Sequence, residues 1–191
     1  MIFLSASIPY EERHRKYIET ADIIAIRDAV RALAAIVIPK SHLVWGGHPS
    51  ITPLIEYVMQ RMSSDLKKHS TLYQTNYFKD FFPKNNSFFE NVTITPENID
   101  RDTSLLDMRK LMIKNHPYTA GIFIGGMEGI EEEFLLFREY HPEALLLPIA
   151  STGAAAKIVC NQYIDSPNPR LLNDYAYMAL FKDLLRNQIK F

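Results

Sequence analysis

Four short apolar runs constrain the fold of this chain more than any other feature of its sequence. They span residues 2–4, 43–45, 122–124 and 145–149, and a segment with helical periodicity follows each of them. Continuous apolar strands of this kind suit a parallel sheet that is buried on both faces. Strands that alternate with helices form βαβ units, which are right-handed by default. The sequence therefore predicts a three-layer α/β fold with a mainly parallel central sheet flanked by helices.

The helical segments are expected at 17–38, 52–62, 104–114, 129–140 and 171–189. Two further strands are expected near 71–74 and 92–95. The stretch from 70 to 95 holds an unusual concentration of aromatic side chains, namely Tyr73, Tyr77, Phe78, Phe81, Phe82, Phe88 and Phe89. Aromatic clusters in a compact domain usually fill the core, so core filling is the first interpretation. The alternative is that the cluster forms the wall of a pocket or a contact between subunits.

Length, charge and cysteine content narrow the class of protein. With 191 residues, 47% of them hydrophobic, residues 1–191 are expected to form one domain without disulfide or metal staples. Lys and Arg number 21 against 22 Asp and Glu, which leaves no positive field to draw the protein onto nucleic acid or a membrane. A small-molecule partner is therefore expected instead.

Metal, cofactor and secretion signals are absent from the pattern of residues. Cys160 stands alone in a segment expected to be helical and buried, and the histidines lack metal-ligand spacing, so we expect neither a metal nor a cofactor. The first residues, Ile2 to Leu4, read as a buried strand rather than a signal peptide. We expect a cytoplasmic protein.

Candidate ligand-binding residues lie in four loops that should meet at the carboxyl edge of the sheet. They are Ser5 and Ser7; Gly46, Gly47, His48, Ser50 and Thr52; Gly125, Gly126, Met127, Glu128 and Gly129; and Ser151, Thr152 and Gly153. In open α/β sheets the ligand crevice lies at this edge, where strand order reverses. Backbone N–H groups and a helix N-terminus can receive an anion there. Turns and helix caps need Gly, Ser and Thr whatever the function, so a purely structural role is the alternative for each loop.

None of these loops matches a common nucleotide motif. No Lys follows a glycine run before Ser or Thr, and no G-x-G-x-x-G fingerprint is present. The sequence therefore excludes a P-loop kinase and an ordinary dehydrogenase.

The glycine loops and one helix together resemble the SLOG superfamily over most of the chain. This Rossmann-like group joins the LOG phosphoribohydrolases, DprA-type proteins and sensor domains linked to TIR or sirtuin modules. The LOG hallmark is Met-x-x-Arg-Lys followed by Pro-Gly-Gly-x-Gly-Thr-x-x-Glu. Met108-Arg109-Lys110 and the run from Gly125 to Glu133 stand in a similar relation. The resemblance implies that Arg109 and Glu133 are a catalytic or ligand-binding pair.

Such a pair has an intelligible chemistry. A carboxylate on the first turn of a helix can orient water or stabilise an oxocarbenium-like ribosyl centre, while a guanidinium grips phosphate. The sequence also departs from the LOG pattern, because Ile130 replaces the threonine and the Met-to-Arg spacing is shorter. The first loop, from Gly46 to Pro53, resembles instead the SLOG domains of antiviral systems such as Thoeris effectors, which bind cyclic ADP-ribose-type signals.

Three functions remain open at this point. The first is a sensor, acting in a signalling or anti-phage context, that binds a nucleotide or NAD-derived ligand and passes binding to a homo-oligomer or a TIR-type effector. The second is a phosphoribohydrolase or related N-glycosidase that uses Glu133 with Arg109 on a nucleoside 5′-monophosphate. The third is a structural or assembly protein whose glycine loops are only turns.

Overall fold

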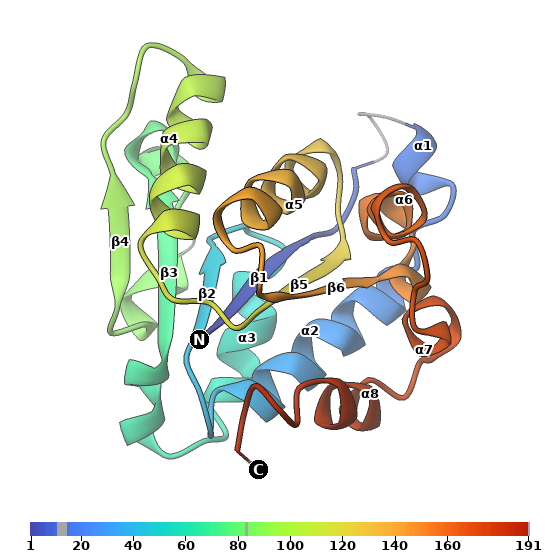
Figure 1. Ribbon diagram of the computed structural model, residues 1–191. Coiled ribbons are helices and arrows are strands. Elements are labelled where there is room, and N and C mark those ends of the chain that lie inside the picture. The colour runs from blue at the N-terminus through green and yellow to red at the C-terminus, as the bar shows by residue number, and fades with distance from the viewer. Residues whose placement is uncertain (11–14, 83, 191) are drawn as a thin grey trace.

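A six-stranded sheet forms the centre of the part of the chain that the structure describes. The computed structural model describes residues 1–10, 15–82 and 84–190 (Figure 1). The strands are β1 (Ile2–Ser7), β2 (Leu43–Gly46), β3 (Ser70–Thr75), β4 (Val92–Thr95), β5 (Ala120–Gly125) and β6 (Leu145–Ile149). All neighbours pair in parallel, in the order β4-β3-β2-β1-β5-β6. The predicted three-layer α/β fold is confirmed, with a wholly parallel sheet.

The strand order reverses at β1. From β1 the chain adds β2, β3 and β4 on one side, and then crosses back to add β5 and β6 on the other. Right-handed crossovers place the helices that connect the strands of these two halves on opposite faces. One face carries α2 (Ile23–Val37), α3 (Thr52–Met59) and α8 (Tyr177–Leu184), and the other carries α4 (Arg101–Lys114), α5 (Glu128–Tyr140) and α6 (Ala154–Tyr163) (Figure 1).

Alternating side chains of the strands build a separate core on each face. In β1, Leu4 belongs to the core shared with α2, whereas Phe3 belongs to the core shared with α5. Phe3 stacks on Phe137 of α5 with ring centroids 5.2 Å apart. This two-sided burial is the physical reason that the strands read as continuous apolar runs.

The helix expected at 17–38 is in fact two helices, so this prediction was wrong. α1 (Arg15–Ile18) ends before Asp22, and the Asp22 carboxylate accepts a hydrogen bond of 2.9 Å from Ala25 N and caps α2. The expected helix at 171–189 is likewise divided into α7 (Pro169–Asn173) and α8. There the Asp174 carboxylate accepts from Ala176 N at 2.7 Å. In both places a local carboxylate bond interrupts an apolar pattern that continues across the turn.

The aromatic segment between β3 and β4 only partly enters the core. It forms 3-10 turns, η2 (Asn76–Phe81) and η3 (Lys84–Phe88), and η1 (Ser64–His69) precedes β3. Tyr73 and Phe89 are buried, as core filling predicts, but Phe81 is 80% exposed. The core interpretation was therefore wrong for this part of the cluster.

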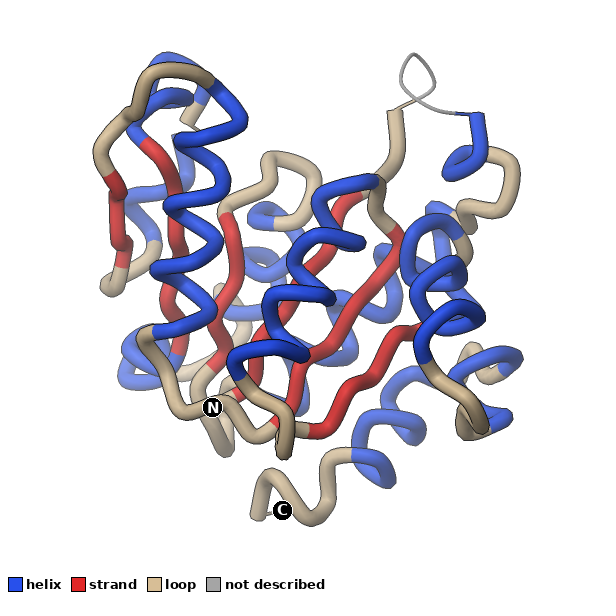
Figure 2. The backbone as a smooth tube through the Cα atoms, turned by 45° about the horizontal axis from the view of Figure 1, so that its top comes forward, coloured by secondary structure: helices blue, strands red, loops and turns tan. Residues whose placement is uncertain are grey.

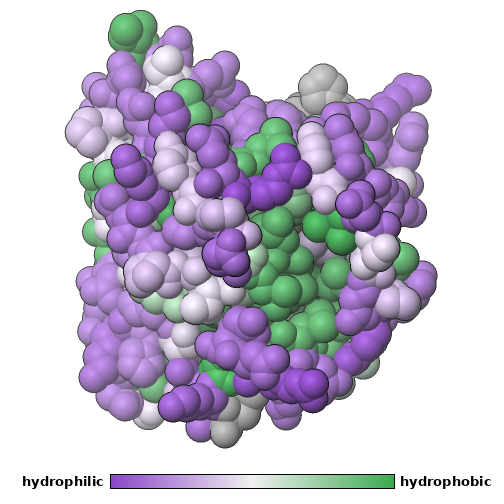
Figure 3. Space-filling view, viewed as in Figure 1, coloured by the Kyte–Doolittle hydropathy of each residue, from purple (hydrophilic) through white to green (hydrophobic). Residues whose placement is uncertain are grey.

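The face that carries α4, α5 and α6 is mostly hydrophilic at its rim, and apolar side chains gather in a hollow beside α5 (Figure 3). Among the described residues, no helix is both long enough and apolar enough to cross a membrane.

Candidate functional site

A cavity of about 970 Å³ lies between α4 and α5, at the carboxyl ends of β1, β2 and β3. Figure 2 turns the carboxyl ends of the strands toward the reader and shows the backbones of α4 and α5 side by side in front of the sheet. The place agrees with the strand order, because ligand crevices of open α/β sheets form where that order reverses. The volume is in the range of small-molecule sites. This cavity is therefore the candidate site.

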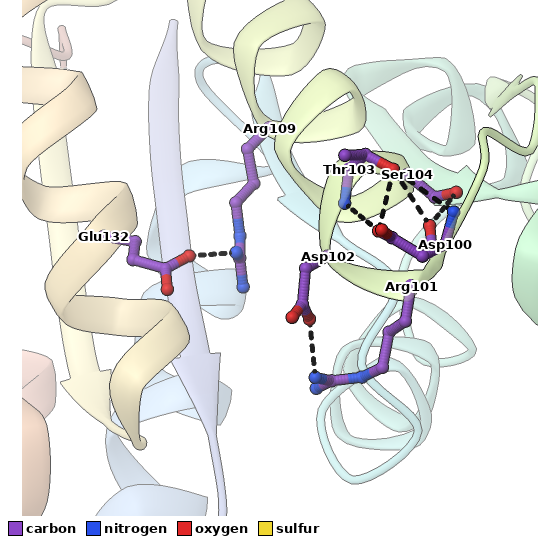
Figure 4. Close-up of polar contacts among 7 residues, drawn as sticks. All are labelled: Asp100, Arg101, Asp102, Thr103, Ser104, Arg109 and Glu132. Atoms are coloured by element: carbon purple, nitrogen blue, oxygen red, sulfur yellow. Dashed lines mark hydrogen bonds and ion pairs between the residues drawn. The ribbon is translucent and has the colours of Figure 1, made fainter.

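Arg109 links the two helices across the cavity. Its Nε donates a hydrogen bond of 3.1 Å to Glu133 Oε1, and its Nη1 pairs with Glu132 on the same helix, α5 (Figure 4). The side chains of Arg109 and Glu133 are each 12% exposed, whereas that of Glu132 is 54% exposed. A Cβ added to Gly129 would lie 2.5 Å from Arg109 Nη2, so the guanidinium lies directly against the start of α5.

Glu133 is held from the sheet as well. Ser5 Oγ donates to Glu133 Oε2 at 2.5 Å, so both carboxylate oxygens have a protein donor. Ser5 and Ser7 lie inside β1 rather than after it, and only Ser7 lines the cavity. Glu133 lies on the second turn of α5, which begins at Glu128, and not on the first turn as expected.

Glu131, which precedes Glu132 and Glu133, contacts α1 and not Arg109. Glu131 Oε1 accepts from Tyr17 Oη at 2.7 Å and from Lys16 Nζ at 3.1 Å, which fastens α1 to α5. Burial raises the pKa of Tyr17, so this phenol stays a donor at neutral pH. Of three consecutive glutamates, one therefore fixes the fold and two hold Arg109.

A capping box positions the start of α4. The Asp100 carboxylate accepts from Thr103 N at 2.8 Å, and Asp100 N donates to Thr103 Oγ1. The hydrogen bond from the Thr103 backbone lowers the pKa of Asp100. The next two residues, Arg101 and Asp102, form an ion pair of 2.9 Å (Figure 4) and line the cavity. The cap thus fixes the helix that carries Arg109.

The cavity lining includes Gly46 at the end of β2, and Gly47 and His48 from the loop after it. His48 Nδ1 and Ser50 Oγ are 2.8 Å apart, and Ser50 Oγ also accepts from Ile8 N at 3.2 Å. Ser50 therefore ties this loop to the one after β1. Thr52 is fully buried and accepts from Trp45 Nε1 at 3.2 Å. Neither Ser50 nor Thr52 lines the cavity, so each supports it from behind.

The glycine turn after β5 uses its first N–H groups internally. Gly125 and Gly126 have φ of +58° and +80°, a region that favours glycine. Gly125 N donates to Thr152 Oγ1 at 2.9 Å, and Gly126 N donates to Ser7 O at 2.8 Å. The anion-receiving role expected of these two N–H groups is thus not open to them. The next three residues, Met127, Glu128 and Gly129, do line the cavity.

The fourth loop, after β6, is separated from the cavity. Ser151 Oγ donates to Asp174 O at 3.0 Å, and Thr152 Oγ1 donates to Ile149 O at 2.6 Å. A Cβ added to Gly153 would lie 1.7 Å from Thr20 O, so this loop packs against the link between α1 and α2. The structure brings three of the four predicted loops together and gives Ser151, Thr152 and Gly153 internal partners instead.

Sequence reasoning missed a large part of the cavity wall. Gln74, Phe78, Phe81, Phe82 and Tyr10 line it, beside the start of α4. The signal was present in the aromatic segment, where a pocket wall was the second interpretation. Core filling was the first interpretation because the sequence does not indicate which side a phenylalanine faces when the backbone is neither strand nor α-helix.

Carboxylates outnumber arginines among the residues that line the cavity. Two arginines, Arg101 and Arg109, line it together with the carboxylates Asp102, Glu128, Glu132 and Glu133. Among the residues that the structure describes, no three His, Cys, Asp or Glu side chains are grouped so that they could hold a metal ion.

A parallel sheet whose order reverses at β1, with a cavity bounded by glycine turns at that reversal, defines a Rossmann-like domain of the nucleotide-related kind. More specifically, residues 16–185 match the model of the SLOG cluster3 family, and the chain belongs to that family. The predicted membership of the SLOG superfamily is confirmed. No curated protein matches the chain well enough to serve as a relative.

Proposed function

We propose that this protein is a sensor that binds a nucleotide or an NAD-derived, ADP-ribose-type ligand in the cavity between α4 and α5. The observation that carries the proposal is the cavity itself, which joins an arginine-carboxylate centre at Arg109 to an aromatic wall at Phe78, Phe81 and Phe82. A nucleotide has the matching parts, since its sugar and phosphate are polar and its base is flat and apolar on both faces. A structural or assembly role fits less well, because glycine loops that served only as turns would not enclose buried charged side chains.

The charge of the cavity favours a ligand with hydroxyl groups and few phosphates. Carboxylates outnumber arginines among its lining residues, and Arg101 and Arg109 are already paired with Asp102 and Glu133. Ribose hydroxyls donate hydrogen bonds to carboxylates, whereas each added phosphate is repelled by them. A monophosphate or an ADP-ribose-type compound suits this lining better than a nucleoside triphosphate.

Arg109 reaches a phosphate by releasing Glu132. The Arg109–Glu132 pair is weak in solution, because the Glu132 side chain is 54% exposed and water screens it. The bond to Glu133 stays, since both of those side chains are only 12% exposed. On binding, the ligand's phosphate oxygen therefore takes the place of Glu132 on the guanidinium.

Calorimetric titration with AMP, ADP-ribose, NAD, cyclic ADP-ribose and ATP tests this proposal. We expect AMP or an ADP-ribose-type compound to bind the wild-type protein more tightly than ATP does. Arg109→Ala should weaken binding by about tenfold or more, because it removes a charge-assisted hydrogen bond. Glu132→Gln should leave the affinity unchanged or raise it, because it removes the competing carboxylate.

The matched control is Arg138→Ala, which removes an exposed arginine of α5 that does not line the cavity. Its affinity should equal that of the wild type. Absence of binding for all five compounds, with circular dichroism showing a folded protein, would refute the sensor proposal. An Arg109→Ala variant that binds as tightly as Arg138→Ala would refute the placement of the ligand.

A second candidate function is hydrolysis of an N-glycosidic bond, and one observation favours it. The Glu133 carboxylate, oriented by Ser5 and Arg109, stands at the cavity wall as the resemblance to LOG enzymes implies. In that reaction the water oxygen would bond to C1′ of the ribose as the C1′–N bond breaks, and Glu133 would take a proton from the water; adenine leaves AMP with a proton, and nicotinamide leaves NAD as the neutral base. Chromatography of AMP or NAD after incubation detects the free base. Release that persists in Glu133→Gln would exclude this mechanism, and no release in the wild type would leave binding as the function.

A further inference from the structure

The segment after β3 forms the end of the cavity farthest along the sheet from β5. β3 ends at Thr75, and the 3-10 turn η2 that follows carries Phe78 and Phe81, with Phe82 next to it. Figure 1 shows this part of the chain at the carboxyl end of β3, behind the first turns of α4. Phe81 is 80% exposed, so its ring contributes little to the fold while lying at a cavity wall. A flat apolar ring in this position is suited to stacking on another flat ring.

Gln74 supplies a polar group beside these rings. Gln74 is 5% exposed as a whole residue and lines the cavity, and its Oε1 accepts a hydrogen bond from Asn86 Nδ2. This hydrogen bond fixes the orientation of the Gln74 amide, and only its Nε2 remains to bind another group. No hydrogen bond joins Gln74 Nε2 to another residue in the described part of the chain. An amide N–H group that lines a cavity and has no protein acceptor can donate a hydrogen bond to an acceptor atom on the edge of a ligand.

Gly47 makes room for that amide. A Cβ at position 47 would lie 2.7 Å from Gln74 Nε2 and 2.6 Å from Gln74 Cγ, closer than any real contact. The φ of Gly47 lies outside the left-handed region, so the backbone does not require a glycine here. The missing side chain therefore serves the placement of Gln74 over the loop after β2.

From this arrangement we infer that Gln74, Phe78, Phe81 and Phe82 form a nucleobase subsite. The base of the ligand stacks on the phenylalanine rings, and Gln74 Nε2 donates to an acceptor atom on its edge. The sugar and phosphate then extend toward Arg109 and Glu133 at the other side of the cavity. This inference rests on the proposed nucleotide-binding function and assigns the base to one end of the same cavity.

Two variants and a matched pair of ligands test the subsite. AMP and ribose 5-phosphate share the sugar and the phosphate and differ only in the base. By calorimetry, Phe81→Ala should weaken AMP binding by about tenfold, which is within the range for loss of one stacking ring, and leave ribose 5-phosphate unchanged. Gln74→Met, which keeps the side-chain volume, should weaken AMP and GMP and again spare ribose 5-phosphate. Tyr175→Ala is the control, because it removes a 61% exposed ring that does not line the cavity.

The outcomes separate this inference from the proposed function. If the wild-type protein binds AMP more tightly than ribose 5-phosphate and Phe81→Ala abolishes that difference, the subsite is supported. If AMP binds but Phe81→Ala and Gln74→Met both behave like Tyr175→Ala, the subsite is refuted while nucleotide binding stands. If AMP, GMP, ADP-ribose and NAD all fail to bind, the proposed function falls and the subsite falls with it.

Discussion

Gly129 offers a way to move Arg109 without touching a charged residue. In the Gly129→Ala variant the new Cβ would lie 2.5 Å from Arg109 Nη2, while ordinary contact begins at 3.4 Å. The guanidinium must therefore retreat by about 0.9 Å, which is the difference between these two values. The side chain is flexible at that end, so it moves and the backbone of α5 stays in place. The charge of the site is unchanged.

The expected result is a loss of affinity without a loss of stability. Alanine in place of a helical glycine favours folding by at most about 1 kcal/mol, which moves the melting temperature of a chain of this size by about 2–4 °C. A displaced guanidinium gives up a charge-assisted bond to the ligand, worth about 1.5–3 kcal/mol. The dissociation constant should then rise roughly 10- to 150-fold.

Thermal melting and calorimetric titration of the same preparation measure both quantities. Gly126→Ala is the contrasting variant, because its φ is +80° and a Cβ would lie 1.9 Å from Ile130 Cγ1. That change should destabilise the fold by about 1–3 kcal/mol or more. If Gly129→Ala keeps wild-type affinity, Arg109 does not hold the ligand. If it melts as early as Gly126→Ala, the guanidinium is too rigid to move and the reasoning is wrong.

Three other changes test how the fold supports the site. Burial, followed by the nearby His116 and His69, lowers the pKa of His42 from 6.5 to about 4, so its contribution is fully present above pH 6.5 and is lost as the pH falls toward 4. Urea unfolding at pH 7.5 and 4.5 should show that His42→Gln removes up to about 2 kcal/mol of this acid sensitivity, because water screens part of the effect on the imidazole; an unchanged difference would contradict it. Thr152→Val should lower stability by about 1–3 kcal/mol in the same assay and leave ligand affinity unchanged. A weakened affinity would mean that the loop after β6 does contribute to the ligand site. Asp100→Ala should lower the melting temperature through loss of the α4 cap, and Asp100→Asn should restore most of that loss.

The layers of the fold could be predicted because they depend on local patterns. Apolar runs at β1, β2, β5 and β6 predict strands buried on two faces, and the cores around Phe3 and Leu4 have that form. The helix boundaries near Asp22 and Asp174 could not be found from periodicity, because each depends on a single carboxylate bond to a nearby backbone N–H. A pattern of apolar residues does not register such a bond.

The candidate site was predictable in part for a similar reason. Arg109 and Glu133 meet because a helix and a strand-turn-helix unit bring them to the same edge, which their spacing of 24 residues allows. A hydroxyl group can face the cavity or bind a backbone group, and tertiary contacts decide which. Thr152, for example, accepts a hydrogen bond from Gly125 N. The aromatic wall was hardest to predict, since 3-10 turns have no side-chain period that separates an inner from an outer face.

The wall at Phe78, Phe81 and Phe82 belongs to a connection at the margin of the sheet. This connection leads into β4, which among the described strands pairs with β3 only and lies at the end of the strand order. Connections of this kind tolerate insertion and exchange, because few core contacts depend on them. The segment is therefore the natural place to graft a new selectivity onto this scaffold, since its length and composition can change while Ser5, Arg109 and Glu133 keep their arrangement.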